Sequence, residues 1–251
     1  MHVLLPPSET KRDGGADGSA LDIGALGYRS LNPVRRRMLA AVRTLSRNRE
    51  TAAAALKLGA TQSFEIDRNR ALRHSPVMAA MDRYTGVLYE ALDSPTLPAA
   101  ARAFAGEHLV IQSALFGLLG AADPIPAYRL SHDSRVPGHP LGRTWREPIA
   151  DELARMPGLI LDLRSESYAA LGPAPTSAWF FRVVTEEPVG TESGGARRAL
   201  NHFNKKGKGE FVRALLEAGV DHPDVDSLVG WALSAGIRLE TGAPGELELV
   251  V

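Results

Sequence analysis

Apolar residues along the chain fall into two patterns, short unbroken runs and longer stretches with a helical repeat. The unbroken runs predict buried strands at 2–5, at the start of 107–130, at 158–168 and at 178–185. The first run stops at Pro6 and Pro7, which cannot continue a central strand. Two further short strands, 237–240 and 246–251, are predicted to pair as a hairpin that closes the chain.

The remaining periodic stretches predict helices, several of which have recognisable start or stop residues. They cover 32–48 with an extension to Gly59, 75–93 with a break near Gly86, 97–105, 142–157, 205–219 and 224–236. Helices and strands alternate without an internal repeat, so we expect one α/β domain over 1–251, an α+β-like mixed sheet with surrounding helices. The connections 12–28, 131–143 and 169–177 are longer than usual, which is common for functional loops.

Composition narrows the range of functions. The 251 residues carry 29 basic and 29 acidic side chains, which argues against binding nucleic acid through bulk charge but leaves room for a local patch. There is no cysteine, which excludes disulfides, thiolate zinc sites and cysteine nucleophiles. No window approaches 18 apolar residues. We expect a soluble cytoplasmic protein with no membrane partner and no cofactor.

Two local patterns suggest chemistry but favour a plainer interpretation. Ser8 and Lys11 match Ser-x-x-Lys, the nucleophile–base pair of serine acylases, yet the motif follows a strand and two prolines instead of opening a helix. A strand-end turn, with Lys11 as an anion ligand at the carboxyl end of a central strand, is the better prediction. His132, Asp133 and His139 share one loop, but their spacing does not favour a metal site, and none is predicted.

Polar residues follow two of the predicted strands. Arg129 comes after a proline-stiffened turn, where it either clamps a carboxylate or phosphate or satisfies loop carbonyls. Arg164, Ser165 and Tyr168 lie at the end of the 158–168 strand. Because polar groups at strand ends gather at one edge of a sheet, we expect Lys11, Arg129 and Arg164 to converge.

The strongest local charge lies in 197–216. Six cations against Glu210 leave a local net charge of +5, and they are Arg197, Arg198, Lys205, Lys206, Lys208 and Arg213. The sequence "GKG" at 207–209 is predicted to open a helix, whose N-terminus and close backbone approach suit a phosphate. Phe203 either stacks on a base or anchors the loop. A solvated basic face is the simpler alternative.

Five segments, in order, resemble the YaaA-like peroxide-stress proteins. They are "VLLPPSETK", "DRYTGVLYEAL", "LFGLLGAADPIPAYRL", "LDLRSESY" and "NKKGKGEFVRAL". The chain departs from the family pattern where the family has Tyr, Arg-Pro, Glu and Asn; these positions are Phe116, Gly120, Ala121, Ser131 and Asp162.

The resemblance implies a compact mixed α/β fold with a basic groove, a helix–hairpin–helix-like element, DNA binding and a role against iron-linked oxidative damage. By matching position, it places Lys11, Tyr84, Arg129, Ser165, Tyr168, Lys205 and Lys206 around that groove. "PPSETK" would then form the groove rim, with Lys11 as a positioning cation.

Three hypotheses follow: DNA binding, catalysis, and a structural or adaptor protein whose basic stretch is only surface. In the first, a stress-response protein binds double-stranded DNA through Lys11, Arg129, Arg164, Lys205, Lys206 and Lys208. In the second, an enzyme holds a small anionic or nucleotide-like substrate in the same cleft. Its candidate catalytic residues are Tyr84, Ser165, Tyr168 and Lys205, with a tyrosine serving as acid or base if a nearby lysine lowers its pKa.

Overall fold

The computed structural model describes residues 1–186, 197–199 and 201–251. Its strands are β1 His2–Leu5, β2 Met78–Ala79, β3 Leu109–Ser113, β4 Gly117–Gly120, β5 Pro124–Ile125, β6 Ile160–Asp162, β7 Trp179–Glu186, β8 Arg197–Ala199, β9 Leu239–Thr241 and β10 Glu246–Val250. Its α-helices are α1 Asn32–Leu45, α2 Arg49–Leu56, α3 Phe64–Arg70, α4 Ala80–Arg83, α5 Val87–Leu92, α6 Ala99–His108, α7 Leu141–Ala154, α8 Glu166–Ala169, α9 Asn201–Ala218 and α10 Val225–Ser234. Short 3₁₀ turns occur at Ile23–Ala25, Arg29–Leu31, Ala60–Gln62 and Ser94–Thr96.

A mixed sheet forms the centre of the molecule, in the order β4-β3-β1-β6-β7-β10-β9, with β8 paired to β7. The inner strands β3, β1, β6, β7 and β10 are parallel, whereas β4, β8 and β9 pair antiparallel. Val3 on β1 is aligned with Leu109 on one side and Leu161 on the other. The predicted mixed α/β fold and its C-terminal hairpin are confirmed.

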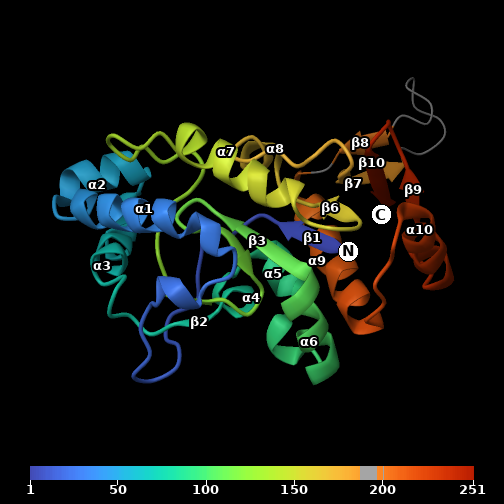
Figure 1. Cartoon of the computed structure of the whole chain (residues 1–251), viewed down its shortest axis with the longest axis horizontal. Coiled ribbons are helices and arrows are strands. Elements are labelled where there is room, and N and C mark those ends of the chain that lie inside the picture. The colour runs from blue at the N-terminus through green and yellow to red at the C-terminus, as the bar shows by residue number, and fades with distance from the viewer. Residues whose placement is uncertain (187–196, 200) are drawn as a thin grey trace.

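Helices cover both faces of this sheet (Figure 1), with α7 on one side and α5, α6 and α9 on the other. β1 is buried on both faces, as its unbroken apolar run predicts for a central parallel strand. The buried apolar side chains from Val3 to Leu249 form a single cluster. This packing leaves the carboxyl ends of β1 and β6 side by side, beneath the loops that follow them.

The helix expected at 205–219 begins earlier, at Asn201, so Gly207 and Gly209 lie inside α9. The prediction that these glycines open a helix N-terminus is therefore wrong, and they give no support to a helix–hairpin–helix element. Their role is close packing instead. A Cβ on Gly209 would lie 2.2 Å from the backbone oxygen of Leu88 on α5, and one on Gly207 would lie 3.2 Å from Val183 Cγ1 on β7.

Three other predicted elements are shorter or divided. The stretch 32–59 forms two helices, because the Asn48 side chain accepts a hydrogen bond from the Thr51 N–H and starts α2 anew. The stretch 75–93 holds β2, α4 and α5, with the predicted break at Gly86, whose φ of +93° favours glycine. The strand expected over 158–168 ends at Asp162, and α8 follows it.

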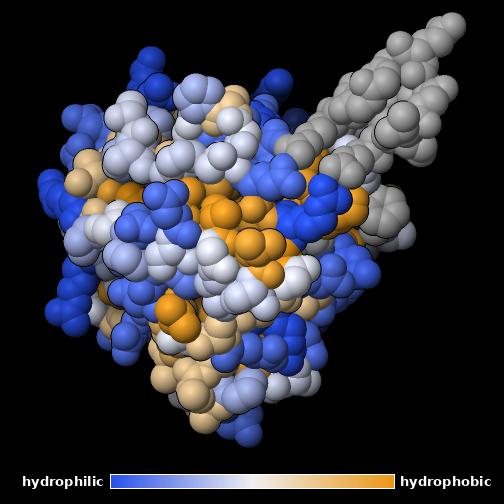
Figure 2. Space-filling model, turned by 90° about the vertical axis from the view of Figure 1, so that its right-hand side faces the viewer, coloured by the Kyte–Doolittle hydropathy of each residue, from blue (hydrophilic) through white to orange (hydrophobic). Residues whose placement is uncertain are grey.

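The end of the molecule that carries α10 and β9 is shown in Figure 2, where hydrophobic side chains interrupt a mostly polar surface. Leu233 on α10 is 78% exposed, more than any other large apolar residue in the described part of the chain. No helix among the described residues has the length and hydropathy to cross a bilayer.

Candidate functional site

A cavity of about 520 Å³ lies at the carboxyl ends of β1 and β6. In α/β folds, this edge of the sheet is where ligands usually bind. Four segments far apart in the sequence form it, together with His132 from the 131–140 loop. The lining residues are Pro6, Pro7, Ser8, Glu9, Thr10, Thr85, Gly86, Val87, Leu88, Tyr89, His132, Ser165, Ser167, Tyr168 and Lys205. We call this space the carboxyl-edge cavity.

Two of its walls are fastened to each other by hydrogen bonds. The Thr85 N–H donates to the Thr10 carbonyl at 3.2 Å, and the two threonine hydroxyls are 2.9 Å apart. The Tyr89 hydroxyl donates to the Pro6 carbonyl at 2.8 Å. A Cβ on Gly86 would lie 3.1 Å from Ser8 Oγ, so glycine allows the walls to approach this closely. The loop after β1 is therefore held in one shape.

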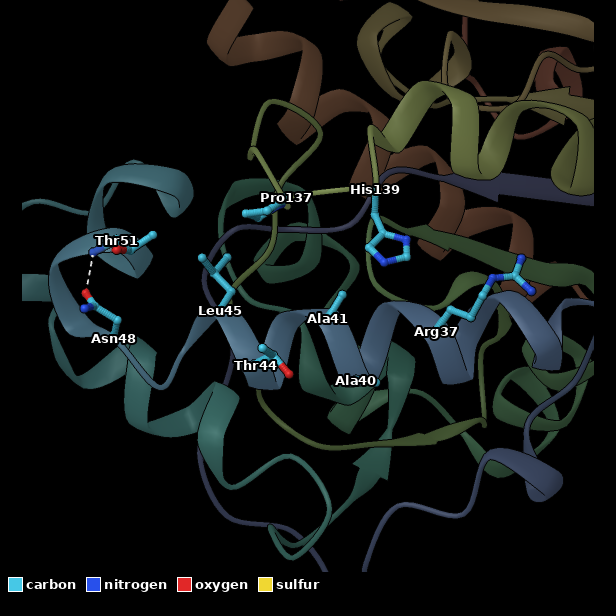
Figure 3. A pocket seen from close by; sticks show the side chains of 9 residues that line it. All are labelled: Arg37, Ala40, Ala41, Thr44, Leu45, Asn48, Thr51, Pro137 and His139. Carbon is cyan, nitrogen blue, oxygen red and sulfur yellow. Dashed lines mark hydrogen bonds between the residues drawn. The ribbon is translucent and has the colours of Figure 1, made fainter.

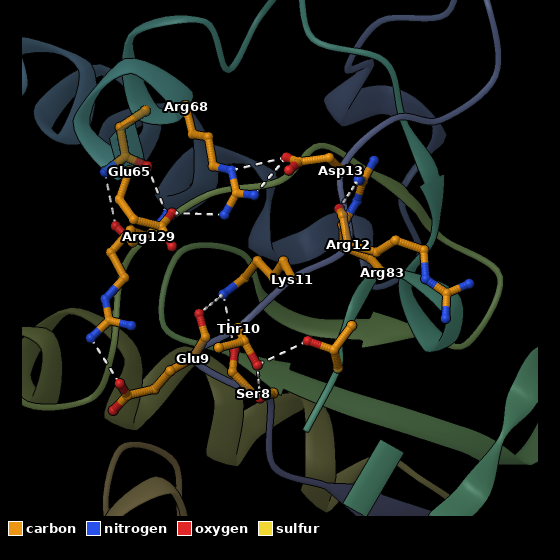
Figure 4. A network of polar contacts seen from close by, with 12 residues as sticks. Ser8, Glu9, Thr10, Lys11, Arg12, Asp13, Glu65, Arg68, Arg83 and Arg129 are labelled. Carbon is orange, nitrogen blue, oxygen red and sulfur yellow. Dashed lines mark hydrogen bonds and ion pairs between the residues drawn. The ribbon is translucent and has the colours of Figure 1, made fainter. Parts of the chain in front are cut away.

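Lys11 lies behind this loop instead of in the cavity (Figure 4). Its Nζ donates to the carbonyls of Ser8 and Glu9, at 2.9 and 3.2 Å, and lies 4.1 Å from the centre of the Tyr128 ring. The side chain is 6% exposed. Burial lowers the pKa of Lys11 to about 7, with Glu65 opposing this effect. Lys11 therefore holds the loop that lines the cavity but does not line the cavity itself, whereas the resemblance places it around the groove.

Lys11 should make stability depend on pH. Its pKa falls from 10.5 to about 7 on folding, so between these values the unfolded chain holds more protons at this position. The free energy of unfolding should therefore rise with pH from about 7 towards 10. We expect Lys11→Met to lack this contribution, so wild type should gain stability relative to the variant between pH 6 and pH 9. Urea unfolding at several pH values measures this, and parallel curves would contradict it.

Arg129 is buried next to the same loop, and its Nη2 donates to Glu9 Oε2 at 2.8 Å. Its backbone is held by Asn69, which accepts from the Arg129 N–H at 2.9 Å and donates to its carbonyl at 2.8 Å. Arg129 Nε is buried without a hydrogen-bond partner among the described residues. Because Glu9 lines the cavity, Arg129 influences the cavity through this carboxylate.

Arg164 does not reach the carboxyl-edge cavity. It is fully buried and forms a two-point ion pair with Asp162, with Nε–Oδ1 and Nη2–Oδ2 distances of 2.7 and 2.5 Å. Its Nη1 donates to Gln112 Oε1 and to the Gly172 carbonyl. Asp162, where the resemblance implies Asn, therefore forms a buried ion pair with Arg164 in the core.

The lysines of α9 separate into three environments. Lys205 is exposed and lines the cavity. Lys206, 60% exposed, forms an ion pair with Glu210 at 3.2 Å. Lys208 is buried, donates to the Leu163 carbonyl at 3.0 Å, and has its pKa lowered by burial to about 8. The side chains of Arg197, Arg198 and Phe203, which the sequence also singles out, lie outside the described residues.

The candidate tyrosines have pKa values shifted in the direction opposite to the one that an acid–base role needs. Tyr84 is buried behind the cavity wall, with its hydroxyl 2.8 Å from that of Tyr128, which in turn contacts Ser113 Oγ at 2.6 Å. Tyr168 lines the cavity next to the His132 ring. Burial raises the pKa of both Tyr84 and Tyr168 well above 10.

The nucleophile–base pair suggested by Ser-x-x-Lys is not formed either. Lys11 Nζ binds the carbonyl of Ser8 and not its hydroxyl, which lies 3.3 Å from Thr10 Oγ1. Ser165 Oγ lies 3.0 Å from Ser167 Oγ. Within the described part of the chain, no three His, Asp or Glu side chains converge as a metal site.

Of the residues predicted from the sequence, Ser165, Tyr168 and Lys205 lie together in the cavity lining. Several other lining residues were not predicted. Thr85 and Gly86 belong to the "YTG" segment, which resembles the family but from which only Tyr84 was named as a site residue. His132 lies in a loop outside the five family segments, and no sequence pattern indicated that it would reach the cavity.

A second hollow, of about 550 Å³, runs along α1 (Figure 3). Its walls are mainly Ala40, Ala41, Leu45 and Pro137, with Arg37 towards one end. None of the predicted site residues lines it, and none of the strand ends reaches it. We therefore assign the candidate site to the carboxyl-edge cavity.

Comparison with known proteins identifies the family. A family model described as peroxide stress protein YaaA matches residues 1–234. This chain belongs to the YaaA family. It is 37% identical over 247 residues to a UPF0246 protein of Corynebacterium glutamicum, covering 96% of this chain and 95% of that protein. A UPF0246 protein of Corynebacterium efficiens is 38% identical over 258 residues, covering all of both chains, and one of Streptomyces coelicolor is 37% identical over 250 residues, covering 98% and 94%.

The family segments meet at the site. "PPSETK", "YTGVLY" and "SESY" supply three walls of the carboxyl-edge cavity, and the lysine pair of α9 supplies Lys205. The YaaA-type motifs therefore surround one space, although several hundred ångströms of extended chain separate the first from the last.

Proposed function

We propose that the protein acts in peroxide-stress defence by binding DNA, and that the carboxyl-edge cavity receives one nucleotide unit of the strand. The observation that carries the proposal is the convergence of three YaaA segments on one cavity bordered by the exposed Lys205. The volume of about 520 Å³ lies in the range of small-ligand sites. Binding of this kind would shield DNA against iron-linked oxidation, the role that the resemblance implies.

The lining matches the two parts of a nucleotide. Val87, Leu88 and Tyr168 offer apolar surface for a base, and the Ser165 and Ser167 hydroxyls with Lys205 offer donors for a phosphate. Arg129 adds positive charge behind the wall, although its ion pair with Glu9 offsets that charge. A phosphate next to Lys205 gains a charge-assisted contact, which is the stronger class of hydrogen bond.

The matched pair Lys205→Gln and Lys206→Gln tests this proposal. Both substitutions remove one positive charge from neighbouring positions of α9, but only Lys205 lines the cavity. We expect Lys205→Gln to weaken binding of a fluorescein-labelled single-stranded oligonucleotide about tenfold, and Lys206→Gln to change it less than about threefold. Fluorescence anisotropy measures both. Equal losses would indicate a general basic surface instead of the cavity.

Competition binding and the salt dependence of the affinity show which class of ligand binds. A duplex, a single strand and a free deoxynucleoside monophosphate compete for the labelled oligonucleotide in separate titrations. Affinity for DNA should fall steeply between 50 and 200 mM salt if several phosphates are contacted. Absence of DNA binding together with binding of the free nucleotide would transfer the proposal to a small anionic ligand. That result would favour the enzyme hypothesis, since the cavity is bounded and holds the Ser165 and Ser167 hydroxyls.

A further inference from the structure

Away from the carboxyl-edge cavity, arginines gather at the C-terminal end of α1. Arg43, Arg47 and Arg70 line a hollow of about 360 Å³, with only Ala40 and Thr44 as its other walls. We call these three residues the α1 arginine cluster. None of its residues lines the carboxyl-edge cavity, so the two sites can be tested separately.

Arg70 donates hydrogen bonds to the backbone carbonyls at this end of α1. Its Nε donates to the Ser46 carbonyl at 2.6 Å, and its Nη2 donates to the Arg47 carbonyl at 3.1 Å. Its Nη1 contacts Asp67 Oδ1 at 3.0 Å. Cations are favourable near the carbonyl end of a helix, and Arg70 already supplies that interaction. Arg70 therefore caps the helix. Arg43 lies in the last turn of α1, where its charge is also favourable, but no side-chain hydrogen bond to a described residue holds Arg43 or Arg47.

Arg43 and Arg47 have no counter-charge in the described part of the chain. Asp67 is the carboxylate of this region, and it pairs with Arg49 at 2.7 Å and with Arg70 at 3.0 Å. No ion pair joins Arg43 or Arg47 to another described residue. Arg43 Nε is buried without a hydrogen-bond partner. A buried donor without a partner costs free energy, so each such group requires an explanation.

We propose that the α1 arginine cluster is a phosphate-binding site. Guanidinium groups bind phosphate oxygens at two points, and Arg43 and Arg47, both in the wall of the hollow, form no ion pair with a described residue that would compete for such binding. The hollow has room for a phosphate or diphosphate group. The phosphate comes either from a free phosphorylated compound or from the backbone of a nucleic acid, since both present the same oxygens.

Isothermal titration with inorganic pyrophosphate tests the site on the full chain. We expect Arg43→Gln/Arg47→Gln to weaken pyrophosphate binding at least about tenfold, because both unpaired cations are lost. The control Arg36→Gln/Arg37→Gln removes the same charge from two exposed positions of the same helix, neither of which lines the hollow. The affinity of this control for pyrophosphate should stay within about twofold of that of wild type. The loss caused by Arg43→Gln/Arg47→Gln should persist in a Lys205→Gln background, which removes the cation of the carboxyl-edge cavity, so the result for the α1 arginine cluster does not depend on that cavity.

The outcomes separate the two sources of phosphate. If an oligonucleotide without terminal phosphates displaces pyrophosphate, the phosphate comes from a nucleic-acid backbone. If only compounds that carry a terminal phosphate displace it, the ligand is a free phosphorylated compound. No pyrophosphate binding to wild type, or equal losses in the two double variants, would overturn the proposal. If Arg43→Gln/Arg47→Gln has an altered thermal unfolding curve, Arg43→Lys replaces it: this variant keeps the charge but loses the fork, and should still weaken binding severalfold.

Discussion

Arg164→Ala should lower the free energy of unfolding by about 3–5 kcal/mol, the usual cost of breaking a buried ion pair from one side. The substitution leaves the Asp162 carboxylate buried at the end of β6 without its two-point partner. It also removes the hydrogen bonds that Arg164 donates to Gln112 Oε1 and to the Gly172 carbonyl. Urea unfolding followed by circular dichroism measures the loss.

Two further variants separate the ion pair from general effects of losing an arginine. Arg155→Ala, at a side chain that is 68% exposed, should change stability by less than about 1 kcal/mol. The double variant Asp162→Asn/Arg164→Ala also removes the buried charge of Asp162, and should be at least about 1 kcal/mol more stable than Arg164→Ala. A double variant no more stable than the single one would show that Asp162 does not depend on Arg164.

Gly209→Ala should destabilise the protein by about 1–3 kcal/mol, the cost of overpacking a filled interior. The added Cβ would lie 2.2 Å from the Leu88 backbone oxygen and 2.8 Å from Ala91 Cβ, so α9 and α5 must separate. α5 follows Gly86 in the wall of the carboxyl-edge cavity, and α9 carries Lys205. The same substitution should therefore weaken oligonucleotide binding as well as stability.

Gly230→Ala is the matched control, since Gly230 also lies inside a helix, α10, but nothing is within 4 Å of its Cβ position. Alanine is the better helix former, so this variant should be neutral or more stable by up to about 1 kcal/mol. Thermal unfolding of both variants compares them directly. A Gly209→Ala protein as stable as Gly230→Ala would contradict the close packing of α9 on α5.

The sequence predicts the central strands well, because a strand buried on both faces is an unbroken run of apolar residues. His2–Leu5 is an unbroken apolar run closed by two prolines, and it is the central strand β1. The glycines of α9 illustrate the limit. Glycine within a basic run resembles a phosphate-binding helix start, whereas Gly207 and Gly209 are required by neighbours from α5 and β7 that local sequence does not reveal.

The sequence predicted only part of the site, because it shows which residues follow the strands but not which partners they meet in the fold. Strand order determines which loops meet, so Ser165 and Tyr168 after β6 lie near the loop after β1. The expected convergence of Lys11, Arg129 and Arg164 is not found in the cavity lining, because Lys11 and Arg129 lie behind that loop and Arg164 is paired in the core. Charge alone did not distinguish cations that bind acceptors inside the protein from cations that are free to bind a ligand. Arg164 and Lys208 are basic residues whose acceptors lie within the core, and only the folded structure reveals those acceptors.

Binding of a nucleotide-type anion in the carboxyl-edge cavity is best tested by a backbone amide NMR titration. Deoxyadenosine 5′-monophosphate is added to the isotope-labelled full-length protein. We expect saturable shifts at Ser8, Thr10, Thr85, Gly86 and Ser165, which line the cavity. Unchanged amides at these positions with millimolar nucleotide, or shifts confined to other parts of the molecule, would contradict it.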